Sequence, residues 1–368
     1  MFIRQFHPFR LEHHTVENWT PGQTFWLVVM ATVGVAAQAL ILFWPLARLG
    51  LKIRPRFGWR GIGLAAAGKL GGWTLATGVV ANLAFMALYR TAAIPTGARS
   101  DAAPGPGAPV PIAGTAVLDQ ATMLYALPHG VIGLSIATVL FNSMAAAVDK
   151  GDRAALVRSL SSSLRVTGVA TVFCMVALII YAGPLGMLFS GDAPAAGAVI
   201  GQVITLIAIG APFMSTAFML GRAFYAQEDA RTPFVVQLAV SVFTVLCAVV
   251  IGHAFRPEHM VYAIAICYAL QNILATVIYH VALTRRIGDY GLSRIVGSHA
   301  RILAAALVAG VAGAGMLWWL GGYRTDGLPW HGQAWAIITL AVGGTVMAVV
   351  YAVALKVFRV QEFTTLLA

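Results

Sequence analysis

The chain has 368 residues, of which 59% are hydrophobic and 10% are charged, and its mean hydropathy is +0.82. Soluble domains have about 25% charged and 45–50% apolar residues, so this composition excludes soluble enzymes and disordered proteins. A net charge of +11 would favour a nucleic-acid partner in a soluble chain, but in a membrane protein basic residues gather in cytoplasmic loops. The composition predicts a multi-pass membrane protein with no nucleic-acid partner.

Nine hydrophobic stretches are long enough to cross a bilayer as helices, for which about 20 apolar residues are needed. None of them alternates apolar and polar residues as the strands of a membrane barrel do. The fold class is therefore all-α. The predicted spans are 22–48, 63–89, 113–146, 163–189, 196–222, 233–254, 259–284, 299–320 and 332–357.

Basic residues are distributed unevenly between the two sides of this topology. Seventeen Lys and Arg residues fall in or beside the loops of one side, whereas the loops between spans on the other side have only Arg90, Arg99, Arg256 and Arg324. The positive-inside rule assigns the richer side to the cytoplasm. We therefore expect a cell-membrane protein with a cytoplasmic C-terminal tail (358–368) and an outer N-terminus.

Two segments outside the spans have unusual compositions. The leader 1–21 is polar and lacks the apolar region of a signal peptide, although the topology requires it to lie outside. This mismatch suggests that earlier spans are missing or that the start is misplaced. The predicted outer loop 91–112 is rich in Pro, Gly and Ala, which favours a flexible linker.

No motif for covalent chemistry is found. The Gly68-Lys69 pair lacks the upstream glycine and the following Ser or Thr of a phosphate-binding loop. The three cysteines are far apart, and the chain has no His-Glu-x-x-His metal motif. We expect no catalytic residues, no metal and no cofactor.

Ionisable side chains inside a span are costly unless they are paired or hydrated, so they are candidate functional residues. Lys69 is placed to meet an anionic head group in a cavity, or else to extend its ammonium group to the interface. Asp119 and Gln120 lie near the outer end of the third span, where Asp119 can pair with a cation or lie just outside the hydrocarbon. These three residues are the candidate cavity or substrate residues.

The third span is interrupted by Pro128, His129 and Gly130. Proline removes a backbone hydrogen bond and glycine adds freedom, which predicts a kink. Such a break serves either as a hinge beside a cavity or as ordinary kinked packing. Further polar residues in later spans (Gln202, Gln237, Gln271, Asn272 and His280) are typical of interhelical hydrogen bonds.

Two stretches resemble a known family. LPHGVIGLSIATVLFNSMA (127–145) and GRAFYAQEDARTPF (221–234) resemble the MurJ/MviN lipid II flippases, of the multidrug/oligosaccharidyl-lipid/polysaccharide exporter superfamily. The second stretch contains a charged loop motif with Arg222, Glu228, Asp229 and Arg231. The stretch AQAL…LKIRPRFGWRG (37–61) is similar to actinobacterial members.

The resemblance implies a fold of fourteen helices, with two six-helix lobes and two extra C-terminal helices. On that plan 22–62 is the last N-lobe helix with its basic loop, 63–284 is the C-lobe, and 299–357 is the extra pair. Five helices of the plan are then absent from the chain, including the first two, where the family's catalogued essential arginines largely lie. The family's Asp-Arg pair before the broken helix is also replaced, by Thr122 and Met123.

The function implied by the resemblance is export of lipid II or a related polyprenyl-pyrophosphate glycolipid by alternating access. The alternatives are an exporter of another polyprenyl-linked glycan and a non-transporting membrane scaffold for cell-wall or division proteins. Expected partners are the lipid substrate, membrane lipids, and a separate N-lobe or cell-wall synthesis proteins.

Overall fold

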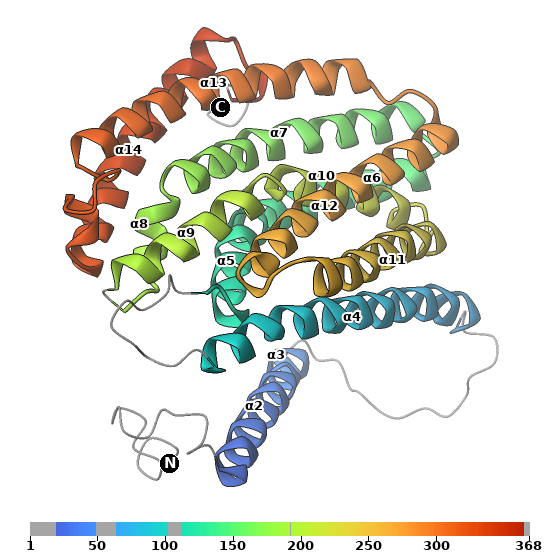
Figure 1. The fold of residues 1–368 in the computed structure, drawn as a ribbon. Coiled ribbons are helices and arrows are strands. Elements are labelled where there is room, and N and C mark those ends of the chain that lie inside the picture. The colour runs from blue at the N-terminus through green and yellow to red at the C-terminus, as the bar shows by residue number, and fades with distance from the viewer. Residues whose placement is uncertain (1–19, 49–63, 102–111, 192, 364–368) are drawn as a thin grey trace. The chain divides into compact units, whose positions relative to one another are not determined.

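The computed structural model describes residues 20–48, 64–101, 112–191 and 193–363 of the chain. All regular elements in these ranges are helices (Figure 1). The chain divides into two compact units, Met1–Leu64 and Ala65–Ala368, which are described separately.

The first unit contains α2 (Pro21–Ile41) and α3 (Phe43–Arg48), so the predicted span 22–48 is interrupted at Leu42. Thr20 and Gln23 form a capping box at the start of α2, in which the Thr20 N–H donates to Gln23 Oε1 at 2.6 Å. The apolar side chains of α2 are exposed, as expected of a helix in lipid.

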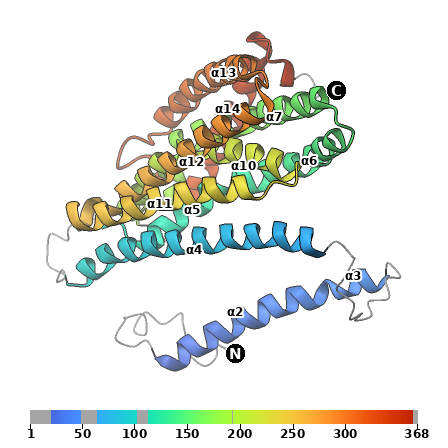
Figure 2. The ribbon, with the colours of Figure 1, turned by 90° about the vertical axis from the view of Figure 1, so that its right-hand side faces the viewer.

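The second unit holds the remaining helices. Their bounds are α4 (Leu64–Asp101), α5 (Thr115–Pro128), the π-helical η3 (His129–Gly133), α6 (Leu134–Asp149), α7 (Arg153–Ile180), α8 (Ala182–Met187), α9 (Pro194–Ala208), α10 (Ala211–Tyr225), α11 (Arg231–Ala254), α12 (Pro257–Ile287), α13 (Leu292–Trp319), the short 3₁₀ helix η4 (Leu328–Trp330) and α14 (Gln333–Val357). Figures 1 and 2 show α13 and α14 on the α7 side of this unit, and α4 beside α11.

Seven described helices are long and apolar enough to cross a membrane, and two bent pairs raise the number to nine, which confirms the all-α multi-span prediction. The first pair bends by 41° at the break between Thr115–Val131 and Leu134–Asp149, around the Pro128-His129-Gly130 sequence. There the Leu134 N–H donates to the His129 carbonyl, one residue farther than in an α-helix.

The second bent pair was not predicted. Pro194–Ala208 and Ala211–Tyr225 also meet at 41°, with Gly210 between them and Pro212 in the first turn of α10. A side chain on Gly210 would approach the Ala269 backbone on α12 to 2.9 Å. Glycine therefore lets the break pack directly against α12.

The prediction of a flexible linker over 91–112 is wrong for its first half. Helix α4 continues through Pro95 to Asp101, and the residues 102–111 lie outside the described ranges. Thr91 and Ala92 are buried, and the Thr91 hydroxyl donates to the Ala248 carbonyl of α11 at 3.3 Å. Contacts with α11 thus stabilise turns that composition alone assigns to a loop.

The core consists of three clusters of buried apolar side chains. One joins α4, α5, α9, α11 and α12; the second joins α6, α7, α10 and α12; the third joins α7, α13 and α14. In the third cluster, the Tyr181 hydroxyl donates to the Gly313 carbonyl at 3.1 Å. Helices α13 and α14 are therefore packed against the rest of this unit through α7 and Tyr181.

Candidate functional site

A cavity of about 820 Å³ lies within the second unit, between α4, η3, α6, α10, α11 and α12. This volume is within the range of sites that bind small molecules, about 300–1,000 Å³. Much of the wall is apolar, with Leu70, Phe85 and Leu88 from α4 and Val236 and Val240 from α11. The few polar groups in the wall therefore determine what it can bind.

Arg222 is the cation of this cavity. It lies in the last turn of α10, and its guanidinium carbon is 4.7 Å from the centre of the Phe218 ring and 5.8 Å from that of Phe141. Among the described residues its guanidinium has neither an ion pair nor a hydrogen bond. Aromatic faces attract the cation but leave its N–H donors available to an anionic ligand.

His129 joins the π-helical break to the same wall. Its Nδ1 lies 3.1 Å from Ser215 Oγ on α10. Its ring packs edge-on against the Phe218 ring, with 4.8 Å between the ring centres. The cavity lining thus includes both His129 and Arg222, which are 93 positions apart in sequence. The predicted kink does border a cavity, while its role as a hinge stays a prediction.

Hydrogen-bonded side chains line the opposite wall. Thr244 on α11 donates to Gln271 Oε1 on α12 at 2.8 Å, and Asn272 Nδ2 donates to the Tyr125 hydroxyl on α5 at 2.9 Å. Gln237 donates to Ser241 within α11 at 3.1 Å. Interhelical bonds, the predicted role of these polar residues, are therefore present for Gln271 and Asn272.

The candidate residues Lys69, Asp119 and Gln120 do not line this cavity. Lys69 is exposed near the start of α4, whereas the Tyr89 hydroxyl donates to the Asp119 carboxylate near the other end of that helix. Twenty helical residues separate Lys69 from Tyr89, or about 30 Å at 1.5 Å per residue. Lys69 is thus far from the Tyr89–Asp119 contact, and a cavity or substrate role for these three residues stays a prediction.

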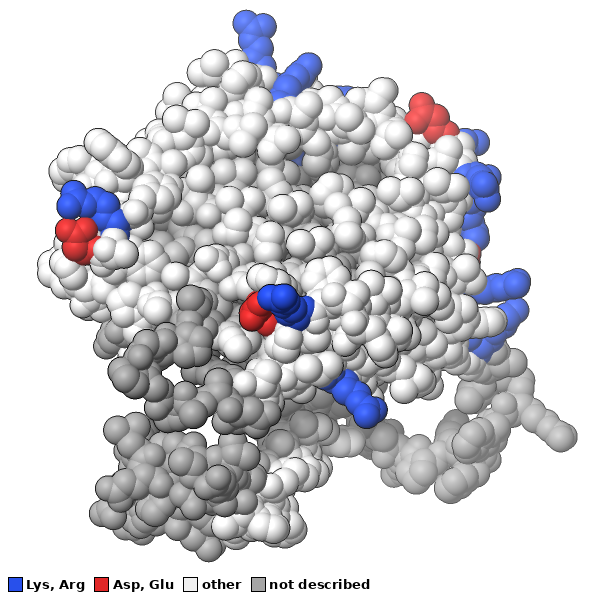
Figure 3. Space-filling model, viewed as in Figure 1, with Lys and Arg blue, Asp and Glu red and all other residues white. Residues whose placement is uncertain are grey.

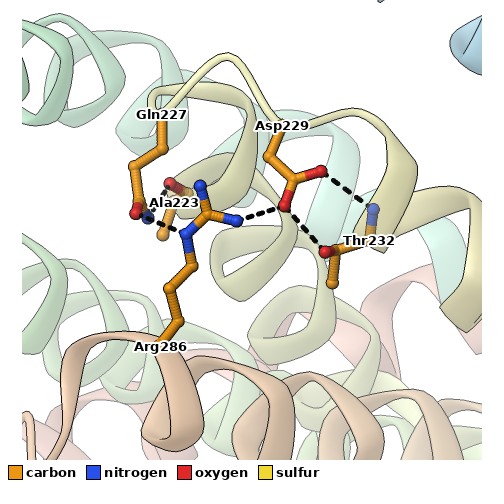
Figure 4. A network of polar contacts seen from close by, with 5 residues as sticks. All are labelled: Ala223, Gln227, Asp229, Thr232 and Arg286. Atoms are coloured by element: carbon orange, nitrogen blue, oxygen red, sulfur yellow. Dashed lines mark hydrogen bonds and ion pairs between the residues drawn. The ribbon is translucent and has the colours of Figure 1, made fainter.

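A compact polar network forms around Asp229, one of the four motif residues, at the α10–α11 turn (Figure 4). Arg286 on α12 donates from Nε to Gln227 Oε1 at 3.0 Å and pairs with the Asp229 carboxylate. Asp229 also accepts hydrogen bonds from the Thr232 N–H at 3.0 Å and the Thr232 hydroxyl at 2.7 Å. Partial burial raises the pKa of Asp229, but these hydrogen bonds and the Arg286 charge outweigh it and hold the pKa below the ordinary value of 3.8.

The four motif residues therefore separate into different environments. Arg222 faces the cavity and Asp229 fixes the turn, whereas Glu228 and Arg231 are exposed. Glu228 has a positive φ of 56°, the left-handed conformation that ends the turn after α10. Arg286, which the sequence did not single out, completes the network, and only the fold brings it there.

Charged side chains gather at one end of the second unit. Figure 3 shows most of the visible Lys and Arg side chains along the edge where the α6–α7 turn and the α12–α13 loop lie in Figure 1. Arg222 and the Asp229–Arg286 network belong to the helix ends of the same side. Away from that edge the visible described surface is mostly uncharged, with a few isolated charged side chains, and many large hydrophobic side chains of this unit are exposed, as expected of a membrane-embedded unit.

Comparisons with known proteins agree with this architecture. Residues 14–323 match the family model described as lipid II flippase MurJ. Over 147 residues the chain is 31% identical to a probable lipid II flippase MurJ of Rhizobium meliloti (strain 1021), covering 36% of this chain and 27% of that protein. Over 147 residues it is 24% identical to a lipid II flippase MurJ of Thermosipho africanus (strain TCF52B), covering 38% of this chain and 29% of that protein.

A solved structure has the same fold. A lipid II flippase MurJ in an inward closed conformation superposes with a TM-score of 0.59 at 17% identity, over 90% of this chain and 63% of that one. The chain thus spans less than two thirds of these relatives. Because the family model matches most of its length, the chain belongs to the lipid II flippase MurJ family.

Proposed function

We propose that this chain is a lipid II flippase, or the C-terminal part of one, and that the Arg222 cavity receives the anionic part of the lipid. The observation that carries the proposal is Arg222, which has no carboxylate partner among the described residues and lies in the wall of a cavity of about 820 Å³ in a MurJ-family chain. Pyrophosphate is the anionic group of lipid II, and arginine donors match phosphate oxygens in pairs.

The cavity wall favours an anion over a neutral ligand. Phe141 and Phe218 lie beside the Arg222 guanidinium, and such apolar neighbours lower the local dielectric constant and so strengthen its interaction with an incoming charge. Gln237, Gln271 and Asn272 add amide groups that can bind sugar or peptide. The polyprenyl tail is assigned to the apolar surface bordered by α13 and α14.

Transport in this proposal is a change of shape without covalent chemistry. The π-helical break at 129–133 is the hinge, because the i to i+5 hydrogen bond and the absent Pro128 N–H leave the helix weakest there. The His129–Ser215 contact couples this hinge to α10, and hence to Arg222. In this proposal the basic end of the lobe faces the cytoplasm, with the C-terminus inside and the N-terminus of this chain outside.

Complementation tests the proposed function. The chain, and in a parallel strain the chain with any upstream reading frame, is expressed in bacteria depleted of their own lipid II flippase. We expect at least one of the two proteins to restore growth. We also expect replacement of Arg222 in that protein to abolish the growth. If both proteins reach the membrane and neither restores growth, the scaffold role for cell-wall proteins replaces the transport role.

A different cargo is tested in the same strains. In strains without restored growth, movement of another polyprenyl-linked glycan into the outer leaflet in a labelling assay would favour that glycan as the substrate over the scaffold role.

A further inference from the structure

A second, smaller pocket lies on the far side of the lobe from α4 and is not used in the proposed transport. Its volume is about 310 Å³, and α7, α13 and the C-terminal segment surround it. The lining residues are Arg165, Ser293, Arg294, Gly297, Ser298, Arg301, Val360, Gln361 and Glu362. Three of these are arginines and one is a carboxylate, so the lining carries a net positive charge.

Arg165 is already used within the protein. Its Nη1 pairs with Glu362 Oε1 at 2.6 Å, and its Nε donates to the Ser161 carbonyl at 3.1 Å. Glu362 is 7% exposed and the neighbouring Val360 is 3% exposed. This pair fastens the C-terminal segment to α7 and closes one side of the pocket.

Arg294 and Arg301 are different, because neither has an ion pair with any residue in the described ranges. They lie seven positions apart on α13, two turns of helix, and thus on one face. Ser298 lies between them on that face. Its side chain is more than nine-tenths buried, yet its hydroxyl has no hydrogen-bond partner among the described residues.

A buried hydroxyl without a partner is destabilising, and the exposed Arg294 and Arg301 on the same helix face are accessible to an anionic ligand. A bound group with several negative oxygens would accept from the hydroxyl and from both guanidinium groups. A phosphate group has this chemistry, and basic pockets between membrane helices are known sites for phospholipid head groups. The predicted spans 163–189 and 299–320 begin beside this pocket, which places it at head-group depth.

We propose that the pocket formed by Arg294, Ser298 and Arg301 binds a phosphate group, either of an anionic phospholipid or of a soluble phosphate. The site is separate from the Arg222 cavity, so it does not depend on the proposed transport function. A phosphate bound there contacts α13 directly beside the segment that Glu362 holds against α7.

The test uses the purified 368-residue chain in a neutral detergent, with thermal unfolding followed by tryptophan fluorescence. The two probes are dioctanoyl phosphatidylglycerol and inorganic phosphate. A saturable rise in melting temperature is expected with the lipid, because a ligand that binds only the folded state stabilises it. A rise with inorganic phosphate as well would identify soluble phosphates as a second source, whereas a rise with the lipid alone would identify the head group.

Three variants make the test specific. R294Q/R301Q is expected to weaken the apparent affinity at least about 30-fold, and S298A about 3- to 10-fold, because charge-assisted hydrogen bonds are lost. Without ligand, S298A should melt no lower than the wild type, since it removes an unsatisfied buried group. The charge-matched control K150Q/R285Q alters exposed residues of the same end outside the pocket and should stay within about twofold.

Two results would overturn the proposal. One is the absence of a saturable shift with both probes in the wild type. The other is an equal loss of affinity in K150Q/R285Q and in R294Q/R301Q, which means general attraction to a basic surface. If R294Q/R301Q does not fold, S298A provides the test instead. Unchanged affinity of S298A for the lipid and for phosphate would then contradict the proposed site.

Discussion

Two arginines near the basic end of the lobe have opposite environments. Arg286 lies 5.9 Å from the Phe224 ring, and its donors are taken up by Gln227 and Asp229. Arg222 lies 4.7 Å from the Phe218 ring and has no such partners within the described residues. The difference shows that residue type and neighbouring aromatic rings do not reveal an arginine's role, whereas its carboxylate partner does.

The energetic consequences of the two environments also differ. A half-buried carboxylate that accepts three hydrogen bonds stabilises the folded chain, and its loss leaves a guanidinium and several donors unsatisfied. Partial burial of an arginine without an anionic partner costs desolvation free energy. Only a bound anionic ligand offsets that cost. Arg286 is therefore expected to determine stability, and Arg222 to determine binding.

The largest expected effect is that of breaking the turn network. D229A should lower the free energy of unfolding by about 3 kcal/mol, because it removes the acceptor of Thr232 and the ion partner of Arg286. Denaturant unfolding of the detergent-solubilised protein measures this loss. The control E228Q changes an exposed neighbour and should stay within about 0.5 kcal/mol. Equal losses in the two variants would mean that the turn is held by its backbone alone.

The next effect concerns the cavity. R222Q should weaken binding of a short-chain polyprenyl pyrophosphate about 30-fold, or about 2 kcal/mol, because the charge-assisted bonds to phosphate are lost. Native mass spectrometry of the detergent-solubilised protein gives the affinity. The control R231Q removes an exposed arginine at the start of α11 and should bind like the wild type. Similar weakening of binding in R222Q and R231Q would mean that Arg222 is not a specific contact for the pyrophosphate.

A smaller effect is expected at the break in the third span. P128A restores a backbone N–H and should make the helix more regular, so that the proposed hinge opens less easily. We expect a transport rate about 3- to 10-fold lower with lipid affinity within about twofold, measured by outer-leaflet labelling of lipid II. An unchanged rate would assign the π-helix to packing and not to motion.

The smallest effect is a pH dependence of the turn network. The pKa of Asp229 lies below its ordinary value of 3.8 in the folded chain, so its contribution to stability is full above that value and is lost as the pH falls through the folded pKa. From pH 5 to pH 3, the wild type should lose stability relative to D229N. A difference that stays constant over this range would mean that the carboxylate is not stabilised in its charged form.

Most of the fold can be predicted from hydropathy, whereas the site cannot. Runs of about 20 apolar residues indicate the nine spans, and the Pro128-His129-Gly130 sequence indicates the first break. The second break at Gly210 and the extension of α4 through Pro95 depend on contacts with α12 and α11. Those contacts have no local signal in the sequence.

The candidate site shows the same limit at the level of single residues. The cost of charges inside spans makes Lys69 and Asp119 candidates, but Lys69 lies near the start of α4, Asp119 lies on α5, and neither lines the cavity. The sequence pattern assigns Arg222 to a loop motif. In the structure it lies in the last turn of α10 and lines the cavity. Spacing along the chain predicts which residues share a helix face, but the pairing of one helix with another decides which charges remain free.

The most direct test compares R222Q and R286Q in one preparation, with both lipid II affinity and the free energy of unfolding measured for each. We predict that R222Q loses affinity about 30-fold at nearly unchanged stability, and that R286Q loses about 2 kcal/mol of stability while its folded fraction binds like the wild type. If both variants lose stability and affinity in the same proportion, the two arginines are equivalent structural residues, and the cavity is not the binding site for the anionic lipid.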